Sequence, residues 1–517
     1  MRSHFKDPKI RHKLQILLLL IILNGGFIMR IHNLSGNPAG FFCDEASIGY
    51  NAYLVLTTGK DEQGVFLPLF FRSLGDYRPA IAVYSTIPFI AIFGLTELAI
   101  RMPSVIYGLL TILTIYFIGK ELSANRKNRT LGLWASLIAA TMPWLIHYNR
   151  TGFEFTSYVT LFTLTILLLL KTLHRKTYII PAFTVAAITV YTYQPARLLI
   201  PLLLIGFVWI NRRQILLHKK STLIALSSFF VLSIPLIINV LSGDGLMRFT
   251  MVSVFSAKLP LDQTILRVAQ NYLTQISPIY FVTGEPTFIT RHFVGGLTPL
   301  LLMTIPFVLI GFLSVLRTVK KDKHSQLITY WLLIYPIAGA VTADAPFTSR
   351  SIIGAPLFAI LISIGIATTI ASLRKTINQY VLISVILLGI LLNLVFFTRF
   401  YFNDYPLYSA NFWGWQYGAR DTVKYFSDVE KDYDDLIMAP EFNASEIFFK
   451  FYAPQSCIKC TIGLPDSAYI KGRRQLFAIT PDYMSAHANF SYKQIRIIRY
   501  PNNSIAFFLV EITNRKL

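Results

Sequence analysis

The segment FFCDEASIGYNAY, residues 41–53, carries two adjacent carboxylates in a chain that has little charge elsewhere. Asp44 and Glu45 are followed by small and aromatic residues, Tyr50 among them, at the spacing of one helix face. This spacing predicts an amphipathic helix along a membrane surface with both acids in its first turn, where the helix dipole favours negative charge. Two interpretations remain open: an acid that caps the helix, and a base that removes a proton from a substrate.

A second acid occurs in HYNRTGFEF, residues 147–155. Arg150 and Glu154 lie four residues apart, so they would share a face of a helix that began there. A surface ion pair is one interpretation, and such a pair contributes little stability. The other is a functional role, because ionisable groups that border an apolar span are costly.

Arginines next to apolar segments provide possible phosphate ligands. Arg78 lies in GDYRPA, Arg197 in YQPAR and Arg350 in APFTSR, where we expect it at the head of a helix. Guanidinium groups suit phosphate oxygens, although a single arginine here is more often an interfacial residue. Together with the acids they predict one polar cavity, with Tyr77 and Tyr50 as further lining candidates. A carboxylate base beside arginines fits sugar transfer from a lipid phosphate, because the acceptor hydroxyl needs a base and the departing phosphate needs positive charge.

The composition places these residues in a membrane protein. Of 517 residues, 54% are hydrophobic and 14% charged, against about 25% charged in ordinary globular domains. The net charge of +22 comes from 48 Lys and Arg against 26 Asp and Glu. The basic residues form short clusters between apolar runs, as the positive-inside rule requires, so we expect no nucleic-acid partner. The clusters predicted to be cytoplasmic are residues 2–13, 120–129, 171–176, 211–220, 317–323 and 374–376.

Eleven apolar segments alternate with these clusters and predict an α-helical polytopic protein with a cytoplasmic amino terminus. The segments are about 14–31, 98–118, 131–147, 155–171, 177–192, 197–211, 221–241, 296–316, 327–342, 351–372 and 378–398. The first is interpreted as a retained span because it lacks a small-residue cleavage site. The apolar segment 78–95 breaks the alternation, and we expect it at the interface or partly inserted.

Two domains follow from this pattern. Residues 1–398 form the transmembrane domain, whose outer loop at about 32–97 carries the acids. Residues 399–517 become polar, with short alternating apolar runs that predict a small α/β domain on the outer side. Cys457 and Cys460 form a CxxC without a second pair of ligands, which favours a local disulfide or two thiols over zinc. Cys43 receives no function.

Several of these segments resemble glycosyltransferases of family 39 in the GT-C superfamily, which includes protein O-mannosyltransferases and is related to the aminoarabinose transferases of lipid A. DEASIGYNAY is similar to the acidic motif of their first external loop, and HYNRTGFEF to their second acidic motif. GDYRPA resembles the Lys-Pro-Pro or His-Pro-Pro segment, with Ala80 in place of the second proline. The charge is kept at Arg78, but the local geometry differs.

The resemblance implies a GT-C fold and an inverting transferase in the plasma membrane. Such an enzyme would move a hexose or pentose from a polyprenyl-phosphate donor to a hydroxyl of a protein, lipid or glycan on the outer side. Asp44 would be the base, Glu45 its companion acid and Glu154 the acid of the second motif. The donor phosphate would be bound by Arg78, Arg350 and Arg150.

Two other functions remain open. A transporter or flippase for lipid-linked sugars would also use acids and arginines, and a membrane scaffold could bind a partner through its outer domain. Transfer chemistry requires Asp44, Glu154 and Arg78 to line one cavity that opens outward. Some relatives hold a divalent metal between such acids, but the sequence assigns no metal site and no cofactor.

Overall fold

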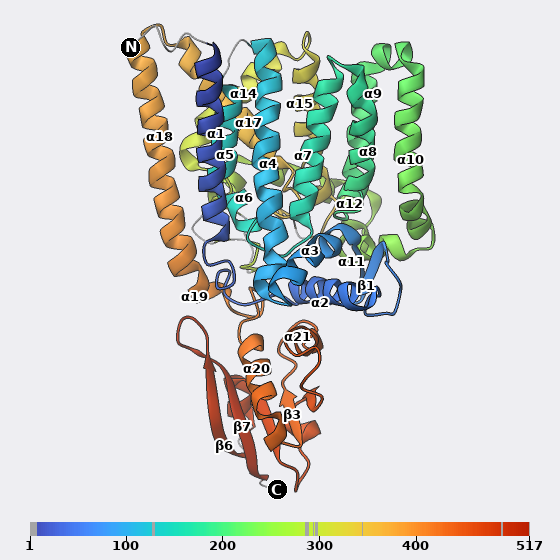
Figure 1. Ribbon diagram of the computed structural model, residues 1–517, viewed down its shortest axis with the longest axis vertical. Helices are drawn as coiled ribbons and strands as arrows, with labels where there is room; N and C mark the ends of the chain where they lie inside the picture. Colours follow the sequence, from blue (N-terminus) through green and yellow to red (C-terminus); the bar gives the residue numbers. More distant parts are fainter. Residues whose placement is uncertain are drawn as a thin grey trace.

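The computed structural model describes residues 8–126, 130–284, 289–292, 294, 298–343, 345–487 and 490–515. Residues 2–7 of the first basic cluster and 127–129 of the second lie outside this part of the chain. Three layers follow one another along the long axis (Figure 1). A bundle of long helices is followed by short helices and a hairpin across its lower end, and then by a sheet domain. The bundle contains the first described helix, and the sheet domain at the other end of the molecule contains the last described strand.

Among the described residues, seven helices are long and apolar enough to cross a membrane. These are α1 (Pro8–Ile31), α4 (Glu97–Arg126), α7 (Phe155–Thr172), α9 (Ala196–Leu217), α10 (Lys219–Leu241), α17 (Gly354–Ser372) and α18 (Thr376–Arg399). Shorter helices stand among them in Figure 1, namely α5 (Leu131–Thr141), α8 (Ile179–Thr189), α14 (Ile305–Thr318) and α15 (Lys323–Ile334). Each of the eleven expected spans overlaps one of these helices. The polytopic helical class is confirmed, while the count of eleven crossings stays a prediction.

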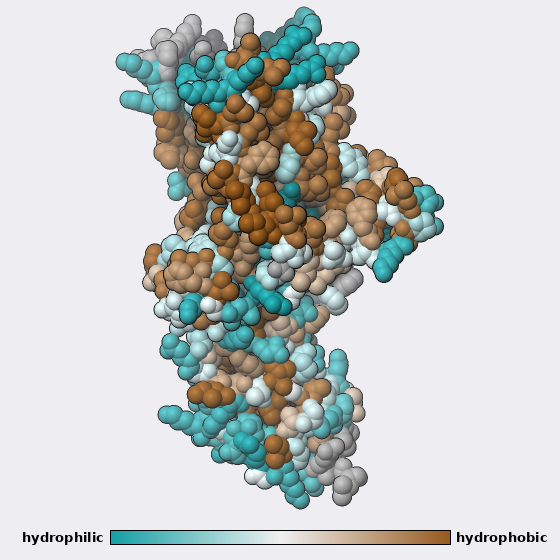
Figure 2. All heavy atoms as spheres, turned by 90° about the vertical axis from the view of Figure 1, so that its right-hand side faces the viewer, coloured by the Kyte–Doolittle hydropathy of each residue, from teal (hydrophilic) through white to brown (hydrophobic). Residues whose placement is uncertain are grey.

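The helices of the bundle differ in how far their apolar stretches are buried. In α17 78% of the apolar stretch is buried, against 17% in α10 and in α18. Helix α17 packs closely on α14 because Gly311 and Gly365 face backbone carbonyls that a Cβ would strike. The outer helices keep apolar side chains exposed, as lipid-facing helices must. Figure 2, which views the bundle from the side of α10, shows apolar side chains as a band below its hydrophilic end.

The second layer is built from residues of the first outer loop. It contains α2 (Cys43–Thr58), the antiparallel strands β1 (Phe70–Ser73) and β2 (Asp76–Pro79), and α3 (Ala80–Phe93). Leu74 and Gly75 turn the hairpin with φ of 53° and 75°, the backbone that suits a two-residue connection. Helix α3 has 14 residues and is about 21 Å long, shorter than the hydrocarbon core. It lies beside α2 below the bundle (Figure 1), in agreement with an interfacial segment.

Short elements connect the bundle to this layer. They are α6 (Pro143–Tyr148), α11 (Met247–Val252), α12 (Leu261–Ile276), α13 (Pro278–Thr283) and α16 (Ile337–Ala340), with the 3₁₀ turns η3 (Asp244–Leu246), η4 (Val254–Ala257) and η5 (Leu302–Thr304). The 3₁₀ turn η2 (Lys176–Tyr178) instead lies between α7 and α8, at the other end of the bundle. Helix α18 continues beyond the expected boundary at 398, through a π-helical turn at Phe400–Asp404, into α19 (Tyr405–Ser409). Within that turn the carbonyl of Tyr401 accepts a hydrogen bond from Asn37 Nδ2 at 2.8 Å.

The third layer is a small α/β domain around a mixed sheet in the order β4-β3-β5-β7-β6. Strand β3 pairs in parallel with β4 and β5, whereas β7 runs antiparallel to β5 and β6. Its elements are α20 (Ala419–Val429), η7 (Glu430–Asp432), β3 (Asp435–Met438), α21 (Glu446–Tyr452), β4 (Cys460–Ile462), α22 (Pro465–Ala468), β5 (Gln475–Ile479), α23 (Pro481–Ala486), β6 (Phe490–Arg499) and β7 (Ile505–Arg515). A disulfide joins Cys457 and Cys460.

Polar contacts attach this domain to the layer above it. Glu97, at the start of α4, accepts a hydrogen bond from the Tyr452 hydroxyl at 2.5 Å and pairs with Arg420 Nη1 at 3.2 Å. Lys450 Nζ lies 3.4 Å from Glu62 beyond the end of α2. These contacts fix the position of α21 against α2.

Candidate functional site

A cavity of about 560 Å³ lies where the second layer meets the bundle. Asp44 from α2, Arg78 from β2 and Glu154 at the start of α7 all line it, so the three residues that sequence reasoning required in one place do meet. Arg197 at the start of α9 and Arg350 before α17 line the same cavity. Residues far apart in sequence therefore converge because a helix start, a hairpin strand and a turn meet at this level.

Asp44 is held by Arg78. Nη2 of Arg78 donates a hydrogen bond to Asp44 Oδ1 at 2.8 Å. The Asp44 side chain is 30% exposed and the Arg78 side chain 12%. Burial alone would raise the pKa of Asp44, but the charge and hydrogen bond of Arg78 and the more distant charge of Arg291 outweigh it, so the pKa lies below its usual value. Asp44 is therefore ionised at neutral pH.

Glu154 has the opposite environment. Burial raises its pKa above the usual value; the Arg78 charge opposes this rise and the Asp44 charge adds to it. Its side chain lines the cavity. The structure thus holds two carboxylates whose pKa values are pushed apart, an arrangement that lets neighbouring acids take different roles.

Glu45 does not line the cavity, which corrects its expected place beside Asp44. Its side chain is fully buried and accepts two hydrogen bonds from Arg101, Nε to Oε1 at 3.0 Å and Nη2 to Oε2 at 3.1 Å. It also accepts from the backbone N–H groups of Phe42, at 3.2 Å, and Gly152, at 2.7 Å. Glu45 therefore caps α2, while Asp44 in the same turn faces the cavity.

Arg150 is likewise placed away from the cavity. Helix α6 ends at Tyr148 and α7 begins at Phe155, so residues 150–154 do not share a helix face as expected. The Arg150 guanidinium donates to backbone carbonyls near the end of α1. Its acceptors are the carbonyl oxygens of Met29, Arg30, His32, Asn33 and Asn37. It anchors the first outer loop and is not available to a phosphate in the cavity.

The two tyrosine candidates also lie outside the cavity lining. Tyr77 alternates with Arg78 on β2, and side chains of successive strand residues point to opposite faces. The ring of Tyr50 is 5.8 Å from Lys450 Nζ, at the junction with the sheet domain. Arg350 is in the cavity, but α17 begins only at Gly354, so Arg350 lies in a turn and not at a helix head.

Two cavity arginines were missed by the sequence analysis. Arg291 donates from Nη1 to the Trp413 carbonyl at 2.7 Å, and its guanidinium carbon lies 4.0 Å from the centre of the Phe42 ring. Arg248 in α11 is 3.8 Å from Asp76. Both belong to the long loop that was placed on the outer side without a motif. Among the described lining residues, five arginines accompany three carboxylates, so the cavity favours an anionic ligand.

An apolar wall also lines this cavity. It is formed by residues of α9, α11, η4 and the segment around α16, including Leu198, Phe249, Phe255 and Val341. Phe249 and Phe255 are 40% and 53% exposed. A ligand with an anionic head and an apolar chain would match both parts of the lining.

Cys43 is buried beside this site. Its Sγ lies 3.6 Å from Asp44 Oδ1, and its backbone N–H donates to Gln416 at 3.1 Å. Burial, followed by the Asp44 charge, raises the pKa of the thiol. Cys43 is thus a packed, neutral thiol.

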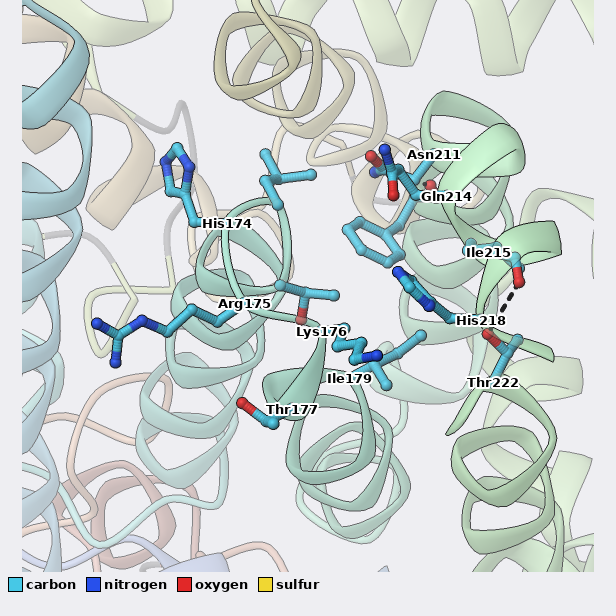
Figure 3. Close-up of a pocket in the computed structure, with 13 residues that line it drawn as sticks. His174, Arg175, Lys176, Thr177, Ile179, Asn211, Gln214, Ile215, His218 and Thr222 are labelled. Atoms are coloured by element: carbon cyan, nitrogen blue, oxygen red, sulfur yellow. Dashed lines mark hydrogen bonds between the residues drawn. The ribbon is translucent and has the colours of Figure 1, made fainter. Parts of the chain in front are cut away.

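A second cavity, of about 570 Å³, lies at the opposite end of the bundle (Figure 3). Basic and amide side chains from the α7–α8 turn and the α9–α10 turn line it, among them Lys176, Asn211 and His218. It contains none of the residues that the acidic motifs provide.

Comparisons with known proteins bear on the fold. Residues 78–238 match the model of the dolichyl-phosphate-mannose-protein mannosyltransferase family, a stretch that contains Arg78, Glu154 and Arg197 but begins after Asp44. A sequence search of curated proteins finds no match. ArnT from Cupriavidus metallidurans bound to undecaprenyl phosphate is 12% identical with a TM-score of 0.55, over 97% of this chain and 98% of that one. This chain has the GT-C fold.

The GT-C fold is found again in further comparisons. ArnT in the apo state gives a TM-score of 0.57 at 10% identity, over the same shares of the two chains. The Archaeoglobus fulgidus oligosaccharyltransferase in the apo form gives a TM-score of 0.54 at 12% identity, over 84% of this chain and 63% of that one. The GT-C resemblance seen in the sequence is thereby confirmed for the fold of nearly the whole chain.

Proposed function

We propose that this multi-pass membrane protein is a glycosyltransferase that moves a sugar from a polyprenyl-phosphate donor to an acceptor hydroxyl. The observation that carries the proposal is the single cavity in which Asp44, Glu154 and Arg78 meet and which an apolar wall also lines. Five arginines suit a phosphate, and the apolar wall suits a prenyl chain. The GT-C fold and the partial match to a mannosyltransferase family support the same reaction class.

The reaction proceeds with inversion in one displacement. The acceptor oxygen forms a bond to the anomeric carbon as the bond from that carbon to the phosphate oxygen breaks. Asp44 takes the hydroxyl proton, and the departing phosphate carries its negative charge to Arg78, Arg291 and Arg350. Donor phosphate competes with Asp44 for Arg78, which frees the carboxylate as a base when donor is bound. Glu154 accepts a hydrogen bond from the acceptor and orients it.

The chain is oriented with its amino terminus in the cytoplasm and the cavity and sheet domain outside the plasma membrane. Basic clusters at the amino-terminal end of the bundle support this orientation. A disulfide in the sheet domain supports it as well, because disulfides persist in oxidising compartments.

A transfer assay tests the proposal. Purified protein in lipid nanodiscs is given a panel of polyprenyl-phosphate sugars with protein, lipid and glycan acceptors, and Asp44→Asn is compared with Asp262→Asn. Asp262 is an exposed residue at the start of α12, away from the cavity lining. We expect Asp44→Asn to lose about 10²–10⁴-fold in rate, because an amide cannot take the proton, and Asp262→Asn to match the wild type.

Two results would contradict the proposal. Undiminished transfer by Asp44→Asn would remove Asp44 as the base. Failure of the wild type to transfer any sugar, combined with donor movement across vesicle membranes, would instead establish a transporter.

A further inference from the structure

Three potential metal ligands meet at the end of the bundle opposite the cavity that contains Asp44. They are Glu121 near the end of α4, His174 in the turn after α7 and His324 in the first turn of α15. One ligand atom of each lies within 4.8 Å of the other two. The three residues come from separate helical segments, so local sequence does not force them together.

The contacts within this cluster are direct. His174 Nε2 lies 3.5 Å from Glu121 Oε1, and the ring centres of His174 and His324 are 4.8 Å apart. The side chain of His324 is 4% exposed and that of Glu121 19%. Figure 3 shows His174 on the opposite side of the second cavity from Asn211 and His218. The cluster therefore adjoins that cavity and shares His174 with its lining, whereas Glu121 and His324 lie outside the lining.

Asp322 fixes the ring of His324. Its Oδ1 lies 3.2 Å from His324 Nδ1, while Oδ2 accepts from the backbone N–H and the hydroxyl of Ser325 at 3.1 and 2.8 Å. A proton on Nδ1 that is shared with a carboxylate leaves the lone pair on Nε2, the arrangement usual for a metal-binding histidine. Asp322 thus orients a ligand in addition to capping α15.

The lysines adjacent to the cluster are engaged elsewhere. Lys120 Nζ lies 5.7 Å from the centre of the Tyr116 ring, and Lys171 Nζ 5.1 Å from that of Tyr178. Lys323, which precedes His324, donates from Nζ to Asn211 Oδ1 at 3.1 Å. The ammonium groups of these three lysines therefore contact groups outside the cluster.

We propose that Glu121, His174 and His324 bind a divalent transition metal, with Zn²⁺ as the ion that suits two imidazoles and one carboxylate. Three protein ligands leave a fourth position for water. Zinc bonds of about 2 Å would draw the three ligand atoms closer together than they lie here. The metal would fasten α4, the α7–α8 turn and α15 to one another, and its role is structural because the cluster lies at the opposite end of the bundle from Asp44.

Cobalt substitution tests the site. The full chain, freed of any histidine tag and treated with chelator, is titrated with Co²⁺ while the visible absorption is recorded. We expect one equivalent to give the intense band of a four-coordinate ion. His174→Gln should weaken binding by at least 10-fold, whereas His12→Gln, an exposed histidine on α1 at the same end, should leave it unchanged. A wild-type spectrum of hydrated Co²⁺, or an unchanged band in His174→Gln, would overturn the proposal.

A second measurement separates a lost site from a misfolded variant. At one Zn²⁺ concentration, the rise in Tm should be largest for the wild type and smaller for both Glu121→Gln and His174→Gln, because each variant binds the ion more weakly. Without metal, all three should unfold at similar temperatures because His174 is half exposed and Glu121 lies near the surface. An equal zinc-dependent rise in Tm in the wild type and in His174→Gln would refute the proposed metal site.

Discussion

At the scale of single residues, two neighbouring acids have separate positions. Glu45 is enclosed with Arg101 and satisfies backbone donors, whereas Asp44 reaches the cavity and pairs with Arg78. Adjacent residues in the first turn of a helix point about 100° apart, so one side can face the interior and the other a cavity. The sequence motif contains both a structural acid and a candidate base.

Glu45→Gln should therefore act on stability. The amide leaves the Arg101 guanidinium buried without its counter-charge, which costs about 3–5 kcal/mol. Thermal unfolding in detergent should show a large fall in Tm relative to the wild type and to Glu446→Gln, an exposed site on α21. A Glu45→Gln protein with wild-type Tm and no transfer activity would return Glu45 to the catalytic group.

The two cavity carboxylates should shape the pH dependence of transfer. Asp44 as the base and Glu154 as the hydrogen-bond acceptor both act when ionised, so the rate is full above both pKa values and falls as the pH drops through the higher one. Because the pKa of Glu154 is raised and that of Asp44 lowered, the acid limb of the wild type should belong to Glu154. In the pH–rate profile of Glu154→Gln, the acid limb of the remaining activity should lie at lower pH than in the wild type. A limb at the same pH in both proteins would mean that Glu154 need not be ionised.

At the scale of elements, the β1–β2 hairpin positions the main phosphate ligand. Arg78 pairs in register with Phe71, and the hairpin is closed by Leu74 and Gly75 with positive φ. A Cβ on Gly75 would meet no atom within 4 Å, so a substitution there strains the backbone alone. The short turn thus controls the distance between Arg78 and Asp44.

Gly75→Ala should weaken donor binding without unfolding the protein. The left-handed backbone costs about 1 kcal/mol more for alanine than for glycine, and relief of this strain would shift Arg78. We expect a several-fold rise in KM for the donor, measured in the transfer assay. Gly25→Ala, in α1 with open space and ordinary helical φ, is the control and should leave KM unchanged. Equal KM values in both variants would show that the turn does not determine how Arg78 binds the donor.

Sequence patterns predicted the bundle and half of the cavity. Hydrophobic length and basic clusters located the helices, and the motifs located Asp44 and Glu154. The arginines next to apolar segments, Arg78, Arg197 and Arg350, also line the cavity as expected. Arg150 was misplaced because a turn replaces the expected helix start. Arg248 and Arg291 enter the cavity through folding of a long loop, and contacts of that kind leave no periodic signal in a single sequence.

At the scale of the whole molecule, the sheet domain is held to the second layer by Glu97. Its carboxylate binds Tyr452 and Arg420 from α21 and α20, and α4, which Glu97 begins, also carries Arg101 and Glu121. One helix therefore contacts the outer domain, the acid that caps α2 and the proposed metal cluster.

Tyr452→Phe should loosen the sheet domain. The change removes a hydrogen bond to a charged acceptor, worth about 1.5–3 kcal/mol, and leaves the ring in place. Limited proteolysis should cut the linker before α20 several-fold faster than in the wild type. Tyr469→Phe, within the sheet domain, is the control. No increase in cleavage would indicate that the apolar packing of α21 on α2 suffices to hold the domain.

The π-helical turn at Phe400–Asp404 has a geometric consequence for this arrangement. A π turn contains one residue more than the α-helical turn it replaces, and each residue of an α-helix advances the chain by about 100°. The extra residue sets the direction in which the chain leaves α19 for the sheet domain, and the same turn presents the Tyr401 carbonyl to Asn37. Deletion of one residue there would restore a regular helix and redirect everything after it by roughly a quarter of a revolution.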